Sequence, residues 1–283
     1  MSNKIAAIIK VIAFFGLWGG LLVFTNHYYS TIPEFFAQAP ALIELWTRIW
    51  PFLIVMFLTL LFAFLLDKKV EVRVFTDRVD RDMLAGLVFG AVWIGGTFGL
   101  LYMTDTIVVA GPETVTDGIF WVITVLLAVF THEFLFRGYV FSLLEEEFSG
   151  MAAVIVTACI PLLLSPGALA GGVVALLTLF AEGIMLGMLR VYTGGMLAPF
   201  LTYLIWSQIG TIVFGTVPLG IHAPTLWTTA LTGIEFVTGG SQMFSGSIIG
   251  LFVLIILIDL GAILMSDKKE LEQKSIFFRR RAK

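Results

Sequence analysis

Three ionisable side chains lie close together in a strongly apolar stretch: His132, Glu133 and Arg137, in the sequence His-Glu-Phe-Leu-Phe-Arg-Gly. A charge at the centre of a bilayer costs about 2.5–3.5 kcal/mol, so such residues normally face the interior of a helix bundle and have a partner. Glu133 and Arg137 are at positions i and i+4, with the acid first, which favours an ion pair on one helical face. His132 points about 100° away from Glu133, so we expect the site to involve other helices.

The composition predicts the environment of these residues. Hydrophobic residues make up 59% and charged residues 13% of the 283 residues, whereas a soluble domain carries about 25% charged residues. Together with apolar runs of about 20 residues, this predicts an all-α, polytopic transmembrane helix bundle. We expect about eight spans, at 6–25, 49–66, 84–103, 119–143, 151–168, 172–190, 196–216 and 246–265. The fifth is interrupted by Pro161 and Pro166.

The positions of Lys and Arg predict the orientation. With the N-terminus inside, the cytoplasmic face receives Lys4, Lys10, the loop 68–81, Arg190 and the tail 268–283, whereas the outer loops receive only Arg48. This asymmetry predicts a multi-pass protein of the cell membrane with both termini in the cytoplasm. The basic, aromatic tail is either a contact with the anionic inner leaflet or a simple flank of the last span. The outer segment 216–245 is expected to lie in the interface or to form a flap over the bundle.

Two further carboxylates lie in expected spans, Glu182 in the sixth and Asp259 in the eighth. Counted from the cytoplasmic helix ends, Glu133, Glu182 and Asp259 lie about 15, 12 and 9 Å deep, so all three are expected to meet in the cytoplasmic half. They either form a functional site or pair with Arg137, Arg190 or backbone groups to fix the packing of helices. The pair Gly183 and Gly187 predicts close packing of the fourth, sixth and seventh spans.

The segment 132–141 resembles the first motif of the CPBP intramembrane proteases. That family contains type II CAAX prenyl endopeptidases, bacteriocin-processing or immunity proteins, and proteins similar to lysostaphin resistance protein A. Its motif Glu-Glu-x-x-x-Arg corresponds here to His132-Glu133-x-x-x-Arg137. The stretch 183–199 is similar to the family's Gly-x-x-x-Gly helix and Thr-Gly turn. The resemblance implies a homologous membrane core at about 84–215, preceded by two helices and a basic loop at 1–83 and followed by the outer loop, last helix and tail at 216–283.

The resemblance also shows where this chain departs from active members. In those proteins the first glutamate activates the attacking water, and histidines of the motifs Phe-x-x-x-His and His-x-x-x-Asn complete the site. Here His132 replaces the glutamate, and Pro161 and Ser165 stand at the positions of the second motif. Tyr203 and Ser207 stand at the histidine and asparagine positions of the third. The other histidines, His27 and His222, fall in expected outer loops.

Water attack on a peptide needs a base near the nucleophile and hydrogen-bond donors or a metal at the developing oxyanion. His132 can serve as a base, and Tyr203 or Ser207 can donate a hydrogen bond. His132, Glu133 and Glu182 can in principle form a divalent-metal set of one histidine and two carboxylates, although the sequence has no His-Glu-x-x-His helix. No other cofactor is indicated.

Three functional hypotheses remain at this point. The first is a bacterial CPBP-like protein that has lost or greatly weakened its peptidase activity and binds other membrane or cell-envelope proteins or peptides; the resemblance suggests envelope enzymes, sensor kinases or bacteriocin systems. The second is an active intramembrane endopeptidase with a rearranged site at His132 and Glu133. The third is a small-molecule carrier, which fits poorly because only the fifth span looks broken. All three place the protein in the lipid bilayer, and none involves nucleic acid.

Overall fold

The computed structural model of the chain describes residues 3–67, 69–221 and 223–281, with the side chains of 27–29 and 267–281 left aside. Its long helices are α1 (Asn3–Ser30), α2 (Pro40–Leu60), α3 (Val79–Met103), α4 (Gly118–Arg137), α5 (Tyr139–Glu147), α6 (Gly150–Leu164), α8 (Gly172–Thr193), α9 (Leu197–Gln208) and α11 (Ile248–Arg281). Short elements are η1 (Phe36–Gln38), α7 (Pro166–Ala170), α10 (Glu235–Thr238) and η4 (Gly240–Gly246), and π-helical turns extend α2 (η2, Leu61–Leu66) and α9 (η3, Ile209–Val213). The contact of the basic tail 268–283 with the inner leaflet was expected for side chains that lie outside those described.

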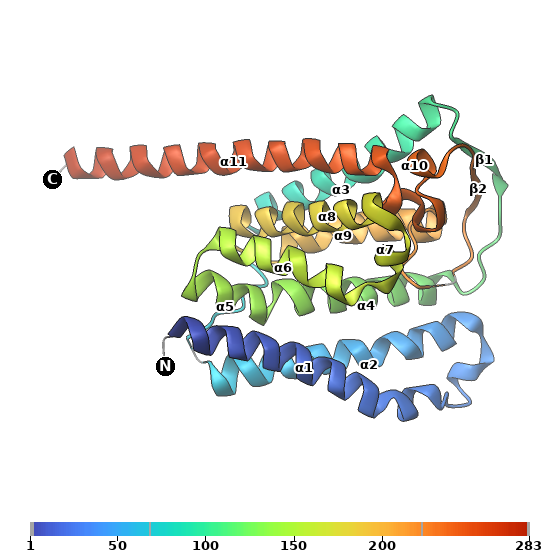
Figure 1. The fold of residues 1–283 in the computed structure, drawn as a ribbon, viewed down its shortest axis with the longest axis horizontal. Coiled ribbons are helices and arrows are strands. Elements are labelled where there is room, and N and C mark those ends of the chain that lie inside the picture. The colour runs from blue at the N-terminus through green and yellow to red at the C-terminus, as the bar shows by residue number, and fades with distance from the viewer. Residues whose placement is uncertain (1–2, 68, 222, 282–283) are drawn as a thin grey trace.

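Six helices in the described part of the chain are long and apolar enough to cross a membrane: Asn3–Asn26, Pro40–Leu66, Val79–Met103, Gly118–Glu147, Gly172–Thr193 and Gly240–Ser266. The remaining two expected spans correspond to the shorter apolar helices Gly150–Leu164 and Leu197–Val213. The protein is therefore a multi-pass helical membrane protein, and the count of eight spans stays a prediction. The marked N- and C-terminal ends lie at the same end of the bundle (Figure 1).

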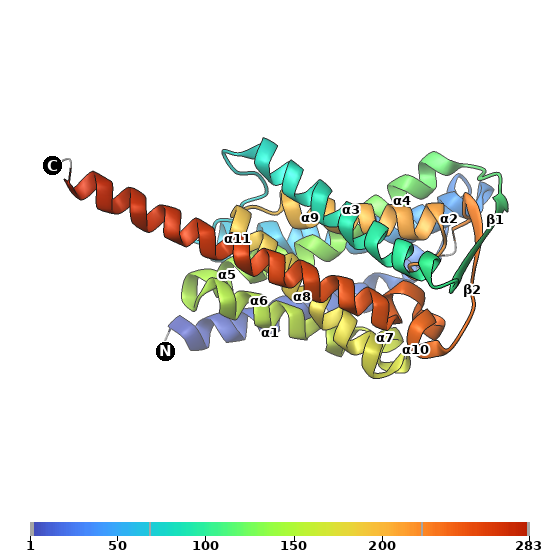
Figure 2. The ribbon, with the colours of Figure 1, turned by 90° about the horizontal axis from the view of Figure 1, so that it is seen from above.

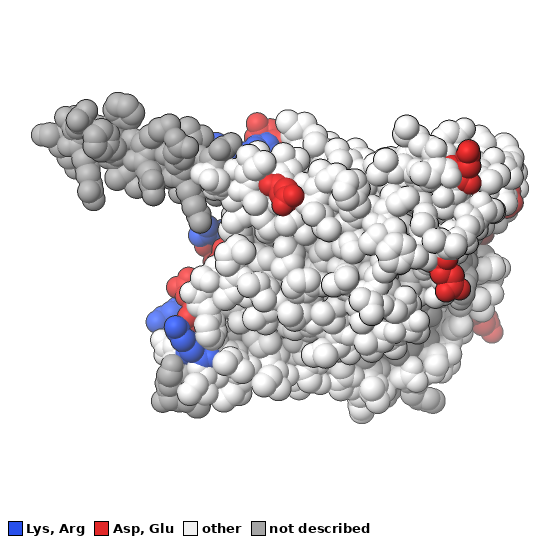
Figure 3. Space-filling model, turned by 45° about the horizontal axis from the view of Figure 1, so that its top comes forward, with Lys and Arg blue, Asp and Glu red and all other residues white. Residues whose placement is uncertain are grey.

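The surface agrees with a membrane environment. On the face drawn in Figure 3, charged side chains gather toward the two ends of the molecule, and all visible Lys and Arg lie at the end where the termini are. Large apolar side chains are exposed along the helices between these ends, among them Val23, Phe57, Leu84 and Phe252. In water such a surface would be unfavourable, whereas lipid tails cover it at no cost.

The fold differs from the all-α expectation at the end of the bundle opposite the termini. Strands β1 (Ile107–Pro112) and β2 (Trp227–Leu231) pair antiparallel there, with Ile107 opposite Leu231 and Val109 opposite Thr229 (Figure 2). β-branched residues favour strands, but the two segments are far apart in sequence, which hides the pairing from a local pattern. The rest of the outer segment 216–245 includes α10 and most of η4, and α10 lies at this end of the bundle (Figure 1).

The helices form two packed groups. In the first, α3 packs against α9, and α8 packs against both α6 and α11; its core contains Trp93 and Trp206, whose rings stack at 4.0 Å. In the second, α1 and α2 pack together and α2 contacts α4, with Phe14 fully buried. The helix α4 contacts α9 of the first group and α2 of the second, so its side chains lie between the two.

Gly183 and Gly187 of α8 pack closely against a different helix from the ones expected. A Cβ placed on Gly183 would lie 2.7 Å from the Cα of Ala158, and one on Gly187 would lie 3.2 Å from the Val154 side chain. Both neighbours belong to α6. The prediction that this pair draws α8 toward the fourth and seventh spans was wrong in that detail, although α4 contacts α9 and α9 contacts α8.

Asp67, at the end of the second span, connects three segments of the chain near the termini. Its Oδ2 atom accepts hydrogen bonds from Lys10 Nζ at 2.7 Å and from Tyr139 Oη at 2.8 Å. Tyr139 is fully buried and packs against the rings of Phe14 and Phe62. The carboxylate therefore ties α1 and the end of α2 to the first residue of α5.

Asp67→Ala is expected to lower the free energy of unfolding by about 1–2 kcal/mol, because it leaves the buried Tyr139 hydroxyl without an acceptor. Thermal unfolding in detergent measures this loss. Asp77→Ala is the matched control: Asp77 is exposed in the same loop, and its removal is expected to change little. Equal stability of the two variants would contradict the role given to Asp67.

Candidate functional site

The site begins where α4 breaks. The expected single span 119–143 is two helices, because α4 ends at Arg137 and α5 begins at Tyr139. Gly138 between them has φ −79° and ψ −120°. A Cβ at this position would lie 2.4 Å from the carbonyl oxygen of Phe134, so the break requires a glycine. The motif residues thus occupy the last two turns of α4, directly before the interruption of the helix at Gly138.

Glu133 and Arg137 form the expected ion pair. Arg137 Nη1 donates to Glu133 Oε1 at 2.8 Å, and both side chains are fully buried. In the described part of the chain, Glu133 Oε2 and the Nε and Nη2 atoms of Arg137 are buried without a hydrogen-bond partner. Burying such atoms costs about 1–3 kcal/mol each. The pair is therefore held by one strong contact and keeps further hydrogen-bonding capacity inside the bundle.

His132 lies beside this pair and also reaches another helix. Its Nδ1 atom is 3.4 Å from both Glu133 Oε1 and Arg137 Nη1. Its ring packs against Tyr203 of α9 at 4.6 Å and against Phe136 at 4.8 Å between centroids. The expectation that His132 meets a residue from another helix is met by Tyr203, while the approach to Glu133 was not expected from the helical pitch.

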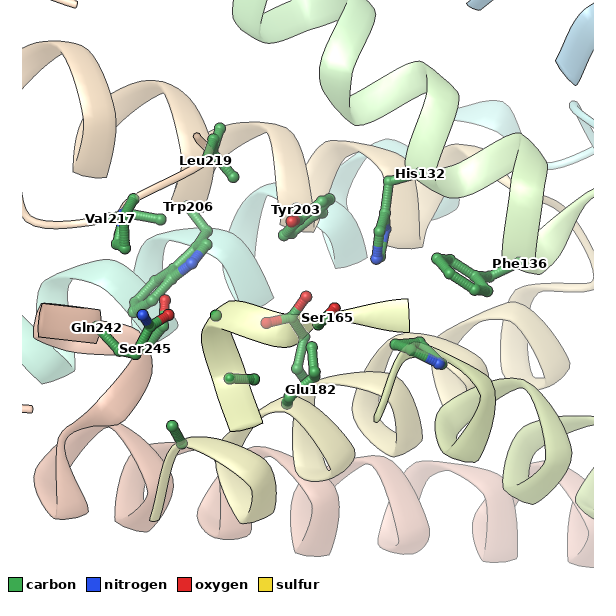
Figure 4. A pocket seen from close by; sticks show the side chains of 16 residues that line it. His132, Phe136, Ser165, Glu182, Tyr203, Trp206, Val217, Leu219, Gln242 and Ser245 are labelled. Carbon is green, nitrogen blue, oxygen red and sulfur yellow. The ribbon is translucent and has the colours of Figure 1, made fainter. Parts of the chain in front are cut away.

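A pocket of about 300 Å³ opens beside His132. Figure 4 shows His132, Tyr203 and Glu182 pointing toward one another across it, with Trp206 further along. The side chains come from α4, α8 and α9, and Ser165 is contributed by the junction of α6 and α7. Val217, Pro218, Leu219, Gln242 and Ser245 also line the pocket; we call these five residues the pocket rim.

The structure brings together some of the candidate residues and separates others. His132, Ser165, Tyr203 and Glu182 line the pocket, as does Pro161. Ser207 lies one turn beyond Tyr203, is fully buried, and is not a lining residue. Glu133 borders a smaller cavity of about 70 Å³ with Val74, Phe130 and Phe200. His132, the candidate base, therefore lines the pocket, whereas Glu133, the remaining carboxylate of the motif, borders the smaller cavity.

Asp259 lies outside the site. The prediction that it joins Glu133 and Glu182 was wrong, because its side chain is exposed on α11. The exposed large residues of α11, which include Phe252, Ile255, Ile256 and Ile263, recur at helical spacing and place Asp259 on the outward face. Hydropathy marks this segment as a candidate membrane span but does not show which face of the helix packs against the rest of the bundle.

The residues do not fit the divalent-metal set of His132, Glu133 and Glu182. Among the described residues no group of three His, Cys, Asp or Glu side chains is arranged to hold a metal ion. Glu133 is committed to Arg137 at 2.8 Å and borders another cavity. The pocket itself offers only one carboxylate and one imidazole, fewer than the three protein ligands of a typical catalytic zinc site.

Several lining residues escaped the sequence analysis. Gln242 and Ser245 come from η4, over 100 residues after His132, and Trp206 and Phe136 resemble ordinary apolar helix residues. The available signal was the polar, glycine-rich stretch 238–247 directly before an apolar span, since polar residues at a membrane helix start can line a cavity.

Fold and site together define a multi-pass helical membrane protein with a buried ion pair beside a polar pocket. Residues 114–209 match the family model of the type II CAAX prenyl endopeptidase Rce1-like proteins. This segment is an Rce1-like (CPBP) domain, as the resemblance of 132–138 and 183–199 implied, and it contains α4 through α9. A comparison with curated proteins gave no match.

Proposed function

We propose that this protein is a bacterial Rce1-like membrane protein without significant peptidase activity, which acts by binding other membrane or cell-envelope proteins or peptides. The observation that carries the proposal is the state of the motif carboxylate. Glu133 is fully buried, bonded to Arg137 and separated from the pocket that His132 and Tyr203 line. A general base must come within hydrogen-bond reach of its water, and a carboxylate engaged in this way serves the packing of the bundle instead.

Four substitutions support the same proposal. His132, Ser165 and Tyr203 occupy positions where the family's active members carry a glutamate and two histidines, and Ser207 replaces the asparagine without reaching the pocket. Without His132, the pocket still has Glu182, Gln242 and Ser245 as hydrogen-bonding groups, so binding does not depend on the imidazole. We further propose that both termini lie in the cytoplasm, on the distribution of Lys and Arg. The division 1–83, 84–215 and 216–283 is proposed on the resemblance to the CPBP family.

One observation favours the second candidate, an active endopeptidase with a rearranged site. His132 lines the pocket together with Glu182 and the Tyr203 hydroxyl (Figure 4). An imidazole base next to a hydrogen-bond donor is the minimum that water attack on a peptide requires.

His132→Ala separates the two candidates. For a binding protein, we expect the variant to complement a deletion strain, because His132 is neither member of the ion pair. For a peptidase, loss of a general base typically costs about 10²–10⁴-fold in rate, and complementation fails. Cleavage of candidate membrane protein substrates by the purified wild-type protein is measured in parallel.

Glu133→Ala is the control for structural damage in that experiment, since it removes half of the buried pair. A folded His132→Ala protein that fails to complement, together with substrate cleavage by the wild type, would overturn the proposal in favour of the peptidase. Expression and gel-filtration profiles of each variant establish that it is folded.

A further inference from the structure

Glu182 is a buried carboxylate that no other residue neutralises directly. Its side chain is 6% exposed, and among the described residues it makes no hydrogen bond or ion pair. Figure 4 shows its carboxylate pointing into the pocket, toward the side of His132 and Tyr203. An ionisable group inside a membrane bundle normally has a partner. The partner of Glu182 must therefore come from the space it faces.

The charges around Glu182 do not cancel. Arg137 and Glu133 are near enough for their charges to act on Glu182. However, the guanidinium of Arg137 is hydrogen bonded to Glu133 at 2.8 Å, so that positive charge is already balanced. With a neutral imidazole at His132, ionisation of Glu182 places one negative charge beside the pocket that the Glu133–Arg137 pair does not balance. In a medium of low dielectric constant, that charge attracts a cation strongly.

Three aromatic side chains, Phe136, Tyr203 and Trp206, are among the other residues that line the pocket. The Trp206 ring is fixed by stacking on Trp93 at 4.0 Å and an interplanar angle of 6°, and the Tyr203 ring is held against His132. Aromatic faces attract cations within about 6 Å, and recognition of organic ammonium groups uses such rings.

The same walls disfavour a metal ion. Calcium requires about six to eight oxygen ligands and magnesium a nearly ideal octahedron, whereas Glu182 is the only carboxylate among the lining residues. An organic ammonium needs one carboxylate and apolar or aromatic contact for its carbon atoms. The cavity volume of about 300 Å³ lies at the lower end of the range for small-molecule sites, about 300–1,000 Å³.

We propose that this pocket binds an organic ammonium group, with Glu182 as its counter-ion and Tyr203, Trp206 and Phe136 around its carbon atoms. The inference rests on the proposed binding function and names the chemical class of the ligand. The ammonium belongs either to a small molecule or lipid headgroup, where it is quaternary or primary, or to a lysine side chain of a peptide. The pocket rim provides Gln242 and Ser245 as hydrogen-bonding groups for the part of the ligand that extends beyond the carboxylate.

Isothermal titration calorimetry on the full chain in detergent, with choline as the probe, tests the proposal. The matched control ligand is 3,3-dimethylbutan-1-ol, which has the shape of choline without its charge. We expect choline to bind at least about tenfold more tightly than the alcohol. Glu182→Gln is expected to weaken choline binding by about tenfold or more, since it removes the counter-ion and keeps the size of the side chain.

Asp259→Asn is the matched control variant, because it removes one intramembrane carboxylate that is exposed on α11 and lies away from the pocket. It is expected to bind choline like the wild type. N-acetyl-lysine amide and N-acetyl-norleucine amide form a second ligand pair that reports a lysine source: tight binding of the lysine compound alone assigns the site to a peptide, whereas preference for choline assigns it to a small molecule or headgroup.

Equal affinity of the charged and the neutral compound in both ligand pairs would overturn the proposal, as would a folded Glu182→Gln protein that binds the preferred ammonium compound as tightly as the wild type. The ligand comparison uses the wild-type chain, so it remains decisive if Glu182→Gln does not fold. Because the titration does not depend on cleavage, failure here leaves the proposed loss of peptidase activity standing. Conversely, substrate cleavage by the wild type would overturn only the proposed function.

Discussion

Arg137→Leu is expected to abolish accumulation of folded protein or to lower the free energy of unfolding by about 3–5 kcal/mol. The substitution leaves the carboxylate of Glu133 fully buried without its partner at 2.8 Å, and breaking one side of a buried pair typically has this cost. Natural domains are stable by only about 5–15 kcal/mol. Fluorescence-detected gel filtration and thermal unfolding in detergent measure the effect.

Two variants make this result specific. Arg73→Leu removes a second arginine that bonds a glutamate at 2.7 Å, but that pair is largely exposed, and surface pairs contribute about 0–1 kcal/mol. Replacing Glu133 and Arg137 together by glutamine removes both charges and should recover part of the loss. An Arg137→Leu protein as stable as Arg73→Leu, or a double variant that expresses no better than Arg137→Leu, would contradict the buried pair.

Gly183→Leu is expected to separate α6 from α8. The nearest atoms to a Cβ at this position are the Cα and Cβ of Ala158, at 2.7 and 2.8 Å. Neither atom can move without moving the backbone of α6. Overpacking of this kind costs about 1–3 kcal/mol and sometimes more, which exceeds the gain of about 0.8–1 kcal/mol in helix propensity. The pocket should be distorted too, because α8 carries Glu182 and α6 carries Pro161.

Gly99→Leu is the matched control for this prediction. Gly99 lies inside α3, and no heavy atom lies within 4 Å of a Cβ built there, so the variant keeps the packing and gains propensity. Thermal unfolding of the two variants is compared with the wild type. A Gly183→Leu protein that unfolds at the same temperature as Gly99→Leu would show that α6 and α8 do not approach as closely as described.

The sequence alone could predict the helices and the central ion pair. Apolar runs mark helices because a membrane span must bury its backbone polar groups within itself, and the spacing of Glu133 and Arg137 leads to contact because residues four apart share a face. Both features are local. The proximity of Tyr203 and His132 could be predicted from the family resemblance, because both residues align with motifs that form one site in the active members.

Other features depend on distances that no local pattern contains. The break at Gly138 has a backbone conformation in which a Cβ would lie 2.4 Å from the Phe134 carbonyl oxygen, but a glycine within an apolar run does not by itself predict the end of a helix. The outward position of Asp259 depends on which face of α11 meets α8 and α3. The contribution of Gln242 and Ser245 to the pocket depends on how η4 packs against α8 and α7.

The pocket is a composite of two parts of the chain. His132, Glu182, Tyr203 and Trp206 lie within the segment 114–209 that matches the Rce1-like model, whereas all five residues of the pocket rim follow it. The proposed counter-ion Glu182 and the polar groups of the pocket rim therefore belong to different parts of the chain. Exchange of residues 216–246 between homologous proteins should therefore change ligand preference while the Glu133–Arg137 pair stays intact.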